Sequence, residues 1–391
     1  MSLVRNSSLV LIGAFSLALG CQTTPKSEVP NDQTPPIGMT PLPTNQSTVS
    51  GATLAIWPLG TVDYDMAVLP IVSPDGRYMA VESGVAPTWP MLLAAPEADP
   101  SAATSIKIWK LDPVNRSMDH HRTLDQPLLL GRGSTEDGFL VESIRSDGSR
   151  WIGMADWNSG KIDWIVRNEH INTQAAIGPN GQLAYVRRLR GGEHFELVIR
   201  TGASQWVQSE PATDLLMPLW SGQRDGLFTI KLRNGLLDLV YSEASSAAAA
   251  RQSRRSLPLA TKATIRTAYQ MLIGQPADRS MAANRREQLL FFHPARHRMA
   301  VWAPFAGPEF APMMLAKESI GAARGPTPET LLIATKTQLL RESTEDINAE
   351  ASLVSGLQIP RATSSKTTPY ILLSPDERVI SVSAFRELTE D

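Results

Sequence analysis

A nine-residue pattern recurs along this chain, and it restricts the possible folds more than any other feature of the sequence. Two copies match closely, at residues 73–81 (SPDGRYMAV) and 374–382 (SPDERVISV), and each follows a short apolar run. Residues 178–186 (GPNGQLAYV) and 293–301 (HPARHRMAV) keep the same spacing, and residues 146–152 (SDGSRWI) are a shortened copy. Proline presets φ in a turn, and Asp-Gly or Asn-Gly tolerates positive φ, so each copy predicts a strand, a tight turn and a second strand. Repetition of such a unit predicts an all-β repeat architecture.

The pattern resembles the S-P-D-G-x-x-(I/L)-A-(F/V) repeat of TolB-like, or WD40-like, β-propellers. The resemblance implies a ring of four-stranded sheets, the blades, around a central channel. Candidate innermost strands begin near Ala67, Pro127, Thr173, Leu215, Thr264, Ile320 and Pro369. Their intervals of 42 to 60 residues exceed the roughly 40–45 residues of a plain blade, and the surplus falls in two predicted insertions, 84–104 and 244–285. We therefore expect a β-propeller over residues 51–391 with seven four-stranded blades, six or eight being the alternatives.

The two ends of the predicted ring are expected to share a blade. After Pro369 the chain has room for only about two strands, too few for a blade. Residues 53–57 (TLAIW) form an apolar run at the start of the domain, and they can supply an outer strand to the last blade. Such mixing of the termini closes the ring and removes an open sheet edge.

The N-terminal segment has the architecture of an export signal. Arg5 precedes an apolar run at residues 9–19, and Ala-Leu-Gly leads directly into Cys21, the only cysteine of the chain. The run is too short to span a bilayer as a permanent helix. The segment resembles the lipobox of bacterial lipoproteins, which implies that residues 1–20 are removed and that the Cys21 thiol is acylated. The alternative is an ordinary export site cut at the same bond, which leaves Cys21 as a free thiol.

Residues 21–50 are predicted to form a disordered tether. Six prolines lie among Thr, Ser, Asn and Gln residues, a composition that buries too little apolar surface to offset the entropy of ordering. As a flexible coil the segment spans on the order of 30 Å. Gln22, not Asp, follows the cysteine; in Gram-negative lipoproteins this resemblance implies sorting to the outer membrane. We expect a cell-envelope protein that faces the periplasm and contacts the membrane through lipid on Cys21.

Charge and motifs argue against several classes of function. The 37 Lys and Arg residues against 39 Asp and Glu give a net charge of −2, which argues against a dedicated nucleic-acid binder. The sequence has no G-x-S-x-G nucleophile elbow, no H-E-x-x-H motif and no glycine-rich phosphate loop. His293 and His297 have the spacing of a helical metal-ligand pair, but the repeat puts them on a turn and a strand. We expect no metal, no cofactor and a monomer.

The two predicted insertions hold the candidate partner-binding residues. Residues 244–300 carry ten Lys or Arg against two acids, and Arg251, Arg254 and Arg255 begin this basic stretch. They suggest a site for an anionic envelope polymer or an acidic protein; the alternative is a solvated loop without a partner. Trp89, flanked by apolar residues in the first insertion, is a candidate apolar anchor for a partner. The alternative is that the insertion folds back and Trp89 packs against the propeller itself.

Two function classes are consistent with these observations. Propellers present rigid loops around a channel, and catalysis needs additional groups that the motifs do not reveal. The favoured class is therefore a protein- or ligand-binding scaffold anchored in the cell envelope. The alternative is a propeller-type hydrolase or lactonase that acts on a small ester or an envelope saccharide through a channel carboxylate or metal. A carboxylate cluster with perturbed pKa at the channel would favour the enzyme.

Overall fold

Antiparallel strands make up almost all of the described structure. The computed structural model describes residues 53–63, 70–83, 105–264 apart from short gaps, 267–268, 271, 289–304, 312–315, 321–324, 330–334, 339–343, 352–353, 368–373 and 379–388. The chain divides into two units, residues 1–37 and 38–391, and every described residue belongs to the second. Cys21, the segment 21–50 and Trp89 lie outside the described residues, so the statements about them stay predictions. Within the described part, no helix has the length and apolar character that a membrane span requires.

Hydrogen bonding joins the described strands into six sheets, one of which has eight strands in the order β13-β12-β11-β10-β6-β7-β8-β9. We divide that sheet at its parallel β6–β10 pairing and so describe seven groups, within which each strand pairs antiparallel with its neighbour. Groups 1 to 4 have four strands each. Group 1 is β2 (Ile71–Val72), β3 (Tyr78–Ser83), β4 (Ser105–Asp112) and β5 (Ser117–Leu124), and group 2 is β6 (Leu128–Ser134), β7 (Gly138–Ile144), β8 (Arg150–Asp156) and β9 (Ile162–Val166). Group 3 is β10 (Ile171–Ile177), β11 (Leu183–Arg188), β12 (Phe195–Thr201) and β13 (Ser204–Glu210), and group 4 is β14 (Leu215–Trp220), β15 (Gly226–Arg233), β16 (Leu236–Glu243) and β17 (Arg255–Ala260). Groups 5 to 7 are β18 (Leu289–His293), β19 (Arg298–Trp302) and β20 (Met313–Met314); β21 (Gly321–Arg324), β22 (Thr330–Ala334), β23 (Leu339–Ser343) and β24 (Ser352–Leu353); and β25 (Thr368–Leu373), β26 (Val379–Leu388) and β1 (Thr53–Asp63).

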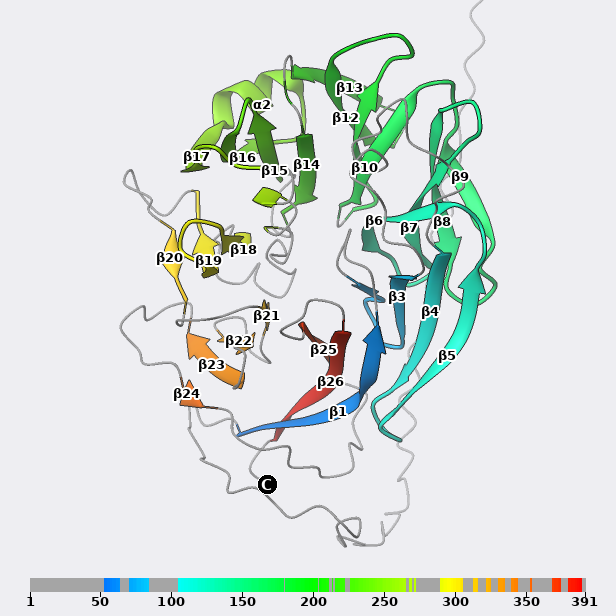
Figure 1. The fold of residues 1–391 in the computed structure, drawn as a ribbon, viewed down its shortest axis with the longest axis vertical. Helices are drawn as coiled ribbons and strands as arrows, with labels where there is room; N and C mark the ends of the chain where they lie inside the picture. The colour runs from blue at the N-terminus through cyan, green and yellow to red at the C-terminus, as the bar shows by residue number, and fades with distance from the viewer. Residues whose placement is uncertain are drawn as a thin grey trace, which may run out of the picture. The chain divides into compact units, whose positions relative to one another are not determined.

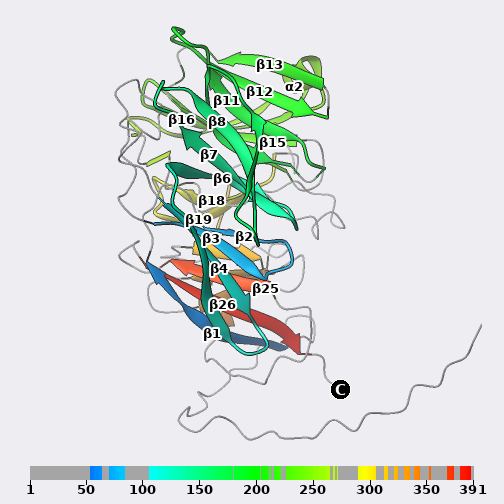
Figure 2. The ribbon, with the colours of Figure 1, turned by 90° about the vertical axis from the view of Figure 1, so that its right-hand side faces the viewer.

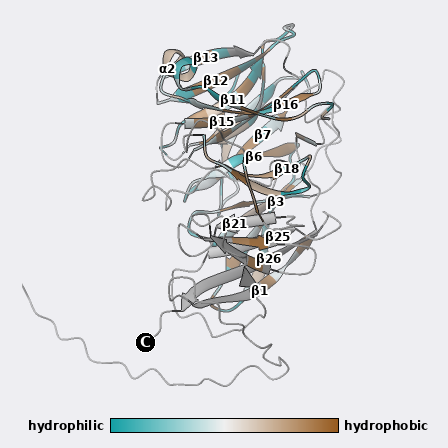
Figure 3. Ribbon diagram, turned by 90° about the vertical axis from the view of Figure 1, so that its left-hand side faces the viewer, coloured by the Kyte–Doolittle hydropathy of each residue, from teal (hydrophilic) through white to brown (hydrophobic). Residues whose placement is uncertain are grey.

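Each group packs on the next through apolar side chains, and the series closes into a ring (Figure 1). Shared buried clusters join groups 1 and 2, 2 and 3, 3 and 4, 4 and 5, and 5 and 6. β21 of group 6 contacts β25 of group 7, and β1 of group 7 contacts β5 of group 1. Figure 3 shows the hydrophobic character of β18. A closed ring of antiparallel sheets confirms the predicted β-propeller.

The two ends of the domain share group 7, as the sequence predicts. The strand order is β1-β26-β25, and Trp57 of β1 is paired in register with Ala384 of β26. β1 and β26 lie side by side in both Figure 1 and Figure 2. Because β1 covers an edge of β26, the N-terminal strand completes a sheet that the C-terminal hairpin begins.

The repeat copies lie at the predicted hairpins. Residues 73–78, 178–182 and 293–298 contain the turns that join the first two strands of groups 1, 3 and 5. Residues 374–378, between β25 and β26, lie outside the described residues. Gly76 and Gly181 have φ of 71° and 74°, values that glycine adopts without strain. The repeat copies therefore follow the first strand in groups 1, 3, 5 and 7, whereas the shortened copy at 146–152 lies between β7 and β8, the second and third strands of group 2.

One predicted inner strand is wrong. Among the described residues no strand begins near Thr264. The Thr264 hydroxyl accepts a hydrogen bond from the Thr267 amide at 3.2 Å, and the Ala268 amide donates to the Thr264 carbonyl at 3.0 Å. Threonine favours this helix-initiating geometry, and the inner strand of group 5 is β18. The predicted insertion 244–285 also contains β17, the outer strand of group 4.

Candidate binding surface

The basic stretch begins on a short helix that is held firmly against group 4. Helix α2 (Ala247–Ser253) follows β16 and is capped by Ser246, whose hydroxyl accepts from the Ala249 amide at 3.1 Å. Alanine, the strongest helix former, fills its first four positions. The Ser253 hydroxyl accepts from the Glu243 amide at 2.7 Å and donates to the Ala249 carbonyl at 2.7 Å. These bonds tie the end of the helix to the end of β16.

The three predicted arginines lie together where α2 passes into β17, and we call them the basic rim: Arg251, Arg254 and Arg255. Arg251 is in the last turn of α2, Arg254 is the C-cap residue, and Arg255 is the first residue of β17. All three are exposed. A cation near a helix C-terminus interacts favourably with the helix dipole, and Arg255 donates from Nη1 to the Arg254 carbonyl at 3.0 Å. Local structure therefore holds the arginine backbones at defined positions.

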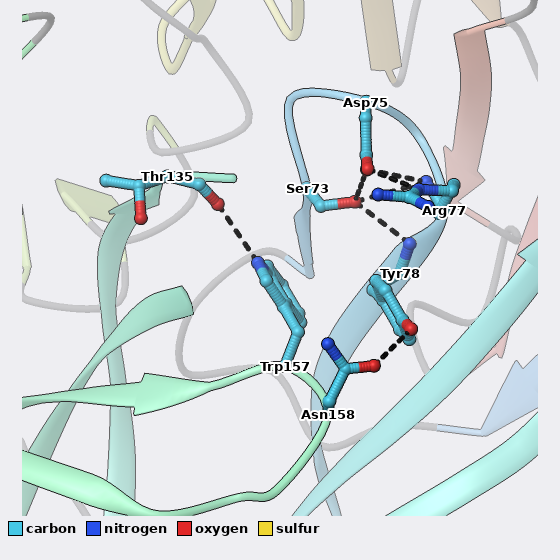
Figure 4. A network of polar contacts seen from close by, with 7 residues as sticks. All are labelled: Ser73, Asp75, Arg77, Tyr78, Thr135, Trp157 and Asn158. Atoms are coloured by element: carbon cyan, nitrogen blue, oxygen red, sulfur yellow. Dashed lines mark hydrogen bonds and ion pairs between the residues drawn. The ribbon is translucent and has the colours of Figure 1, made fainter. Parts of the chain in front are cut away.

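The turn of the first repeat copy is a closed hydrogen-bond network (Figure 4). The Ser73 hydroxyl donates to Asp75 at 2.6 Å and accepts from the Arg77 and Tyr78 amides at 3.1 and 2.9 Å. Asp75 also forms an ion pair with Arg77. The repeat thus carries its own turn-stabilising groups, and the Asp75 carboxylate is engaged within the turn rather than presented to a ligand.

Aromatic contacts fasten this turn to group 2. Tyr78 stacks on Trp157 with ring centroids 5.8 Å apart and an interplanar angle of 13°. The Tyr78 hydroxyl donates to Asn158 at 2.6 Å, and Trp157 donates from Nε1 to the Thr135 carbonyl at 3.0 Å. Figure 4 shows these side chains meeting between the two groups. These contacts fasten the repeat turn of group 1 to the loops of group 2.

Two glutamates are buried inside the ring, and sequence reasoning missed both. Glu82 of β3 accepts from the Leu130 amide of β6 at 2.7 Å. Glu142 of β7 accepts from the Ala175 amide of β10 at 2.9 Å and from the Thr173 hydroxyl at 2.7 Å. In each case the second strand of one group bonds the innermost strand of the next. The signal that could have revealed them is a shared Val-Glu-Ser triplet on β3 and β7.

The position of these glutamates has a simple structural reason. β6 and β10 each have an antiparallel neighbour on one side and share only a single parallel pairing, Arg132 with Ala176, on the other, so the ladder on that side leaves amides to be satisfied by other acceptors. The registers of β6 and β10 are also interrupted, between Leu130 and Ser134 and between Thr173 and Ala176. A buried unpaired amide costs about 1–3 kcal/mol. The two carboxylates remove that cost and clamp neighbouring groups together.

Burial governs the charge of Glu142. Desolvation raises the pKa of its carboxyl above the ordinary value, and the Ala175 amide, the Arg150 charge and the Thr173 hydroxyl oppose that rise. Glu142 is 3% exposed and Arg150 is 2% exposed. A perturbed carboxyl is a candidate acid or base in a cleft, but this one is enclosed between packed strands. Its geometry fits a clamp between groups 2 and 3.

The histidines that resemble a metal pair lie on a hairpin. His293 is the last residue of β18, and His297 lies in the following turn with φ of 50°. Burial lowers the pKa of His293, and the charge of Arg296 lowers it further. Within the described part of the chain, no three His, Cys, Asp or Glu side chains are grouped so as to hold a metal ion. The prediction that the pair is not helical is confirmed.

Comparisons with known proteins found no match by sequence and a distant likeness to solved structures. The sequence matches no family model and no curated protein. The β-propeller domain of Myceliophteria thermophila Cps50 (Swd1) is 12% identical, with 85% of this chain and 99% of that chain covered, at a TM-score of 0.45. The β-propeller domain of the Trilobed protease from Pyrococcus furiosus is 10% identical, with 75% and 85% covered, at 0.40. A putative 6-phosphogluconolactonase from Bacteroides uniformis is 9% identical, with 74% and 86% covered, at 0.40.

The class of protein is therefore defined by its architecture. Strand pairing and packing around the ring make the chain a β-propeller protein. The resemblance to TolB-like repeats is limited to the hairpin pattern.

Proposed function

We propose that this protein is an envelope-anchored lipoprotein whose seven-bladed β-propeller is a binding scaffold for an acidic envelope protein. The observation that carries the proposal is the basic rim: three exposed arginines on an ordered helix–strand junction. Electrostatic complementarity steers association and sets specificity. The packed seams between groups support the rigid-scaffold role.

The membrane part of the proposal rests on the sequence of the N-terminus. Acylated Cys21 would hold one end of the segment 21–50, whose other end precedes β1. The anchor and the propeller are then mechanically separate. A Cys21→Ala variant should fold normally and fractionate as a protein free of the membrane; retention in the membrane fraction would argue against lipidation.

Charge reversal of the basic rim tests the scaffold function. The variant carries Arg251→Glu, Arg254→Glu and Arg255→Glu, and cross-linking in intact cells followed by mass spectrometry identifies captured proteins. We expect loss of an acidic partner that the unmodified protein captures. The matched control reverses three other exposed arginines, Arg122, Arg233 and Arg296, and it should keep the partner.

Three results would count against this function. Equal capture by the basic-rim variant and the unmodified protein would remove the rim from recognition. Loss in both variants would show a non-specific effect of charge. Capture of an anionic polysaccharide in place of a protein would assign the rim to a polymer instead.

The hydrolase alternative lacks a favourable observation among the described residues. Its requirement is a reachable carboxylate or metal in the channel, and the two buried glutamates bond backbone amides between groups. A screen of ester, lactone and glycoside substrates with purified protein tests it directly. Turnover that Glu142→Gln abolishes without unfolding the protein would favour the enzyme.

A further inference from the structure

A tryptophan with two arginines stacked on it lies at the seam of groups 2 and 3. The guanidinium carbons of Arg145 and Arg167 are 4.4 and 4.6 Å from the Trp151 ring centroid. These two distances limit the separation of the guanidinium carbons to at most 9.0 Å. Two like charges this close repel each other, and the indole ring offsets the repulsion through cation–π attraction.

The strand topology brings these residues to one end of the sheet. Arg145 belongs to the turn between β7 and β8, Trp151 lies on β8, and Arg167 begins the connection from β9 to β10. β10 runs parallel to β6, so the two connections lie at the same end of the strands. The site is therefore built from loops that two packed groups support.

The indole is held in place independently of the arginines. Trp151 donates from Nε1 to the Asn168 carbonyl at 3.0 Å. Trp164 packs edge-on against it, with ring centroids 5.8 Å apart at 74°. The Asn168 side chain in turn accepts from the His170 amide at 3.0 Å and from Asn172 at 2.8 Å. The platform under the two guanidinium groups is thus rigid before any ligand arrives.

The two arginines keep their hydrogen-bonding capacity. Both are exposed, and within the described part of the chain neither guanidinium has an ion pair or a hydrogen bond. Stacking uses the face of a guanidinium group and leaves its N–H edges available. A pair of pre-positioned guanidinium edges is suited to a multiply charged oxyanion.

Acidic residues lie on the loops around the arginine pair, so an anion has favourable contacts only at the two arginines themselves. Asp147 accepts from the Ser149 amide and hydroxyl at 3.0 and 2.7 Å, and these bonds lower its pKa. Glu169 and Glu193 are exposed on the adjacent connections. Arg190 also lowers the pKa of Asp147 through its charge, so charges of both signs surround the arginine pair and binding depends on local geometry.

We propose that Arg145 and Arg167, stacked on Trp151, form a binding site for a phosphate group. Arginine forks match phosphate oxygens in pairs, and a tetrahedral dianion can accept from two guanidinium groups at once. This site is separate from the basic rim, which belongs to group 4. The phosphate can come from a soluble phosphate compound or from a lipid headgroup.

Titration of the full chain with inorganic phosphate, followed by calorimetry at constant ionic strength, tests the site. We expect saturable binding, and at least a tenfold loss of affinity in the variant Arg145→Gln/Arg167→Gln. Arg233→Gln, a change at an exposed arginine outside this cluster, should bind as the unmodified protein does. Arg145→Lys/Arg167→Lys keeps the charge but loses the fork geometry, so it should also bind weakly.

Flotation with vesicles distinguishes the two sources of phosphate. Vesicles of phosphatidylglycerol in phosphatidylcholine are compared with phosphatidylcholine alone, using the Cys21→Ala protein so that no acyl chain contributes. If the protein floats with the phosphatidylglycerol vesicles and added inorganic phosphate prevents this, the site binds lipid headgroups. If the protein binds inorganic phosphate but does not float with the vesicles, the site binds soluble phosphate.

The proposal is overturned by either of two results. The first is an absence of saturable phosphate binding in folded protein, with folding checked by circular dichroism. The second is equal phosphate affinity in the Arg145→Gln/Arg167→Gln and unmodified proteins. Full retention of affinity in the double lysine variant would also contradict the fork geometry.

Discussion

Replacing Glu142 is the most direct test of the clamps between propeller groups. Glu142→Ala leaves the Ala175 amide and the Thr173 hydroxyl without the carboxylate acceptor that each bonds now, at 2.9 and 2.7 Å. A buried polar group without a partner costs about 1–3 kcal/mol, so the two together predict a loss of about 2–6 kcal/mol in the free energy of unfolding. Glu142→Gln keeps an acceptor oxygen for the amide and should cost about 1 kcal/mol.

Chemical denaturation at fixed pH measures both losses from the midpoint and slope of the unfolding curve. Glu136 provides the matched control because it is an exposed glutamate in the same group. Glu136→Ala should change the free energy of unfolding by less than about 0.5 kcal/mol. Equal stability of the Glu142→Ala and Glu136→Ala variants would refute the clamp.

The pH dependence gives a second, independent check. Burial raises the pKa of the Glu142 carboxyl in the folded protein, so the folded state holds this proton to higher pH than the unfolded chain does. Its contribution to stability is then complete below the ordinary pKa of about 4.3 and is lost as pH rises through the folded pKa. The stability advantage of the unmodified protein over Glu142→Gln should therefore shrink from acid towards neutral pH. An advantage that grows over this range would contradict the inferred direction of the shift.

Two further predictions concern the repeat turn and the ring closure. Ser73→Ala removes the acceptor for the Arg77 and Tyr78 amides and should lower the free energy of unfolding by about 1–2 kcal/mol in chemical denaturation; an unchanged midpoint would show that these bonds add nothing. Deletion of residues 53–63 exposes the edge of β26, so size-exclusion chromatography should show aggregation, and a synthetic peptide of β1 added in trans should reduce it. A deletion variant that stays monomeric with unchanged thermal stability would contradict the closing role of β1.

Local signals predicted the hairpins well because turn formation depends on a few adjacent residues. The Pro-Asp-Gly turn of the first copy carries its acceptor, its donor and its positive-φ glycine within five residues. The pairing of residues 53–57 with the last strand was also predictable, since a ring that starts with an unpaired apolar strand needs a partner for it. The error near Thr264 arose because an apolar segment was taken for a strand, whereas a threonine cap starts a helical turn there.

The candidate site divides in the same way between local and long-range information. The basic rim is a run in the sequence, so its three arginines were identified without the structure. Glu142 is 33 residues from Ala175 along the chain, and no local pattern indicates which amide a buried carboxylate will accept from. Arg145 and Arg167 are separated by strands β8 and β9, and only the antiparallel return of the chain brings both to Trp151.

The sequence by itself determined the repeat unit, its turns and thus the β-propeller class, because those depend on φ preferences and on alternating burial over short spans. The tertiary structure decided which strand edges meet, which buried amides need an acceptor and which charges share one indole. Those outcomes depend on strand register and on packing between groups, and the pattern of residues along the chain does not specify either of them.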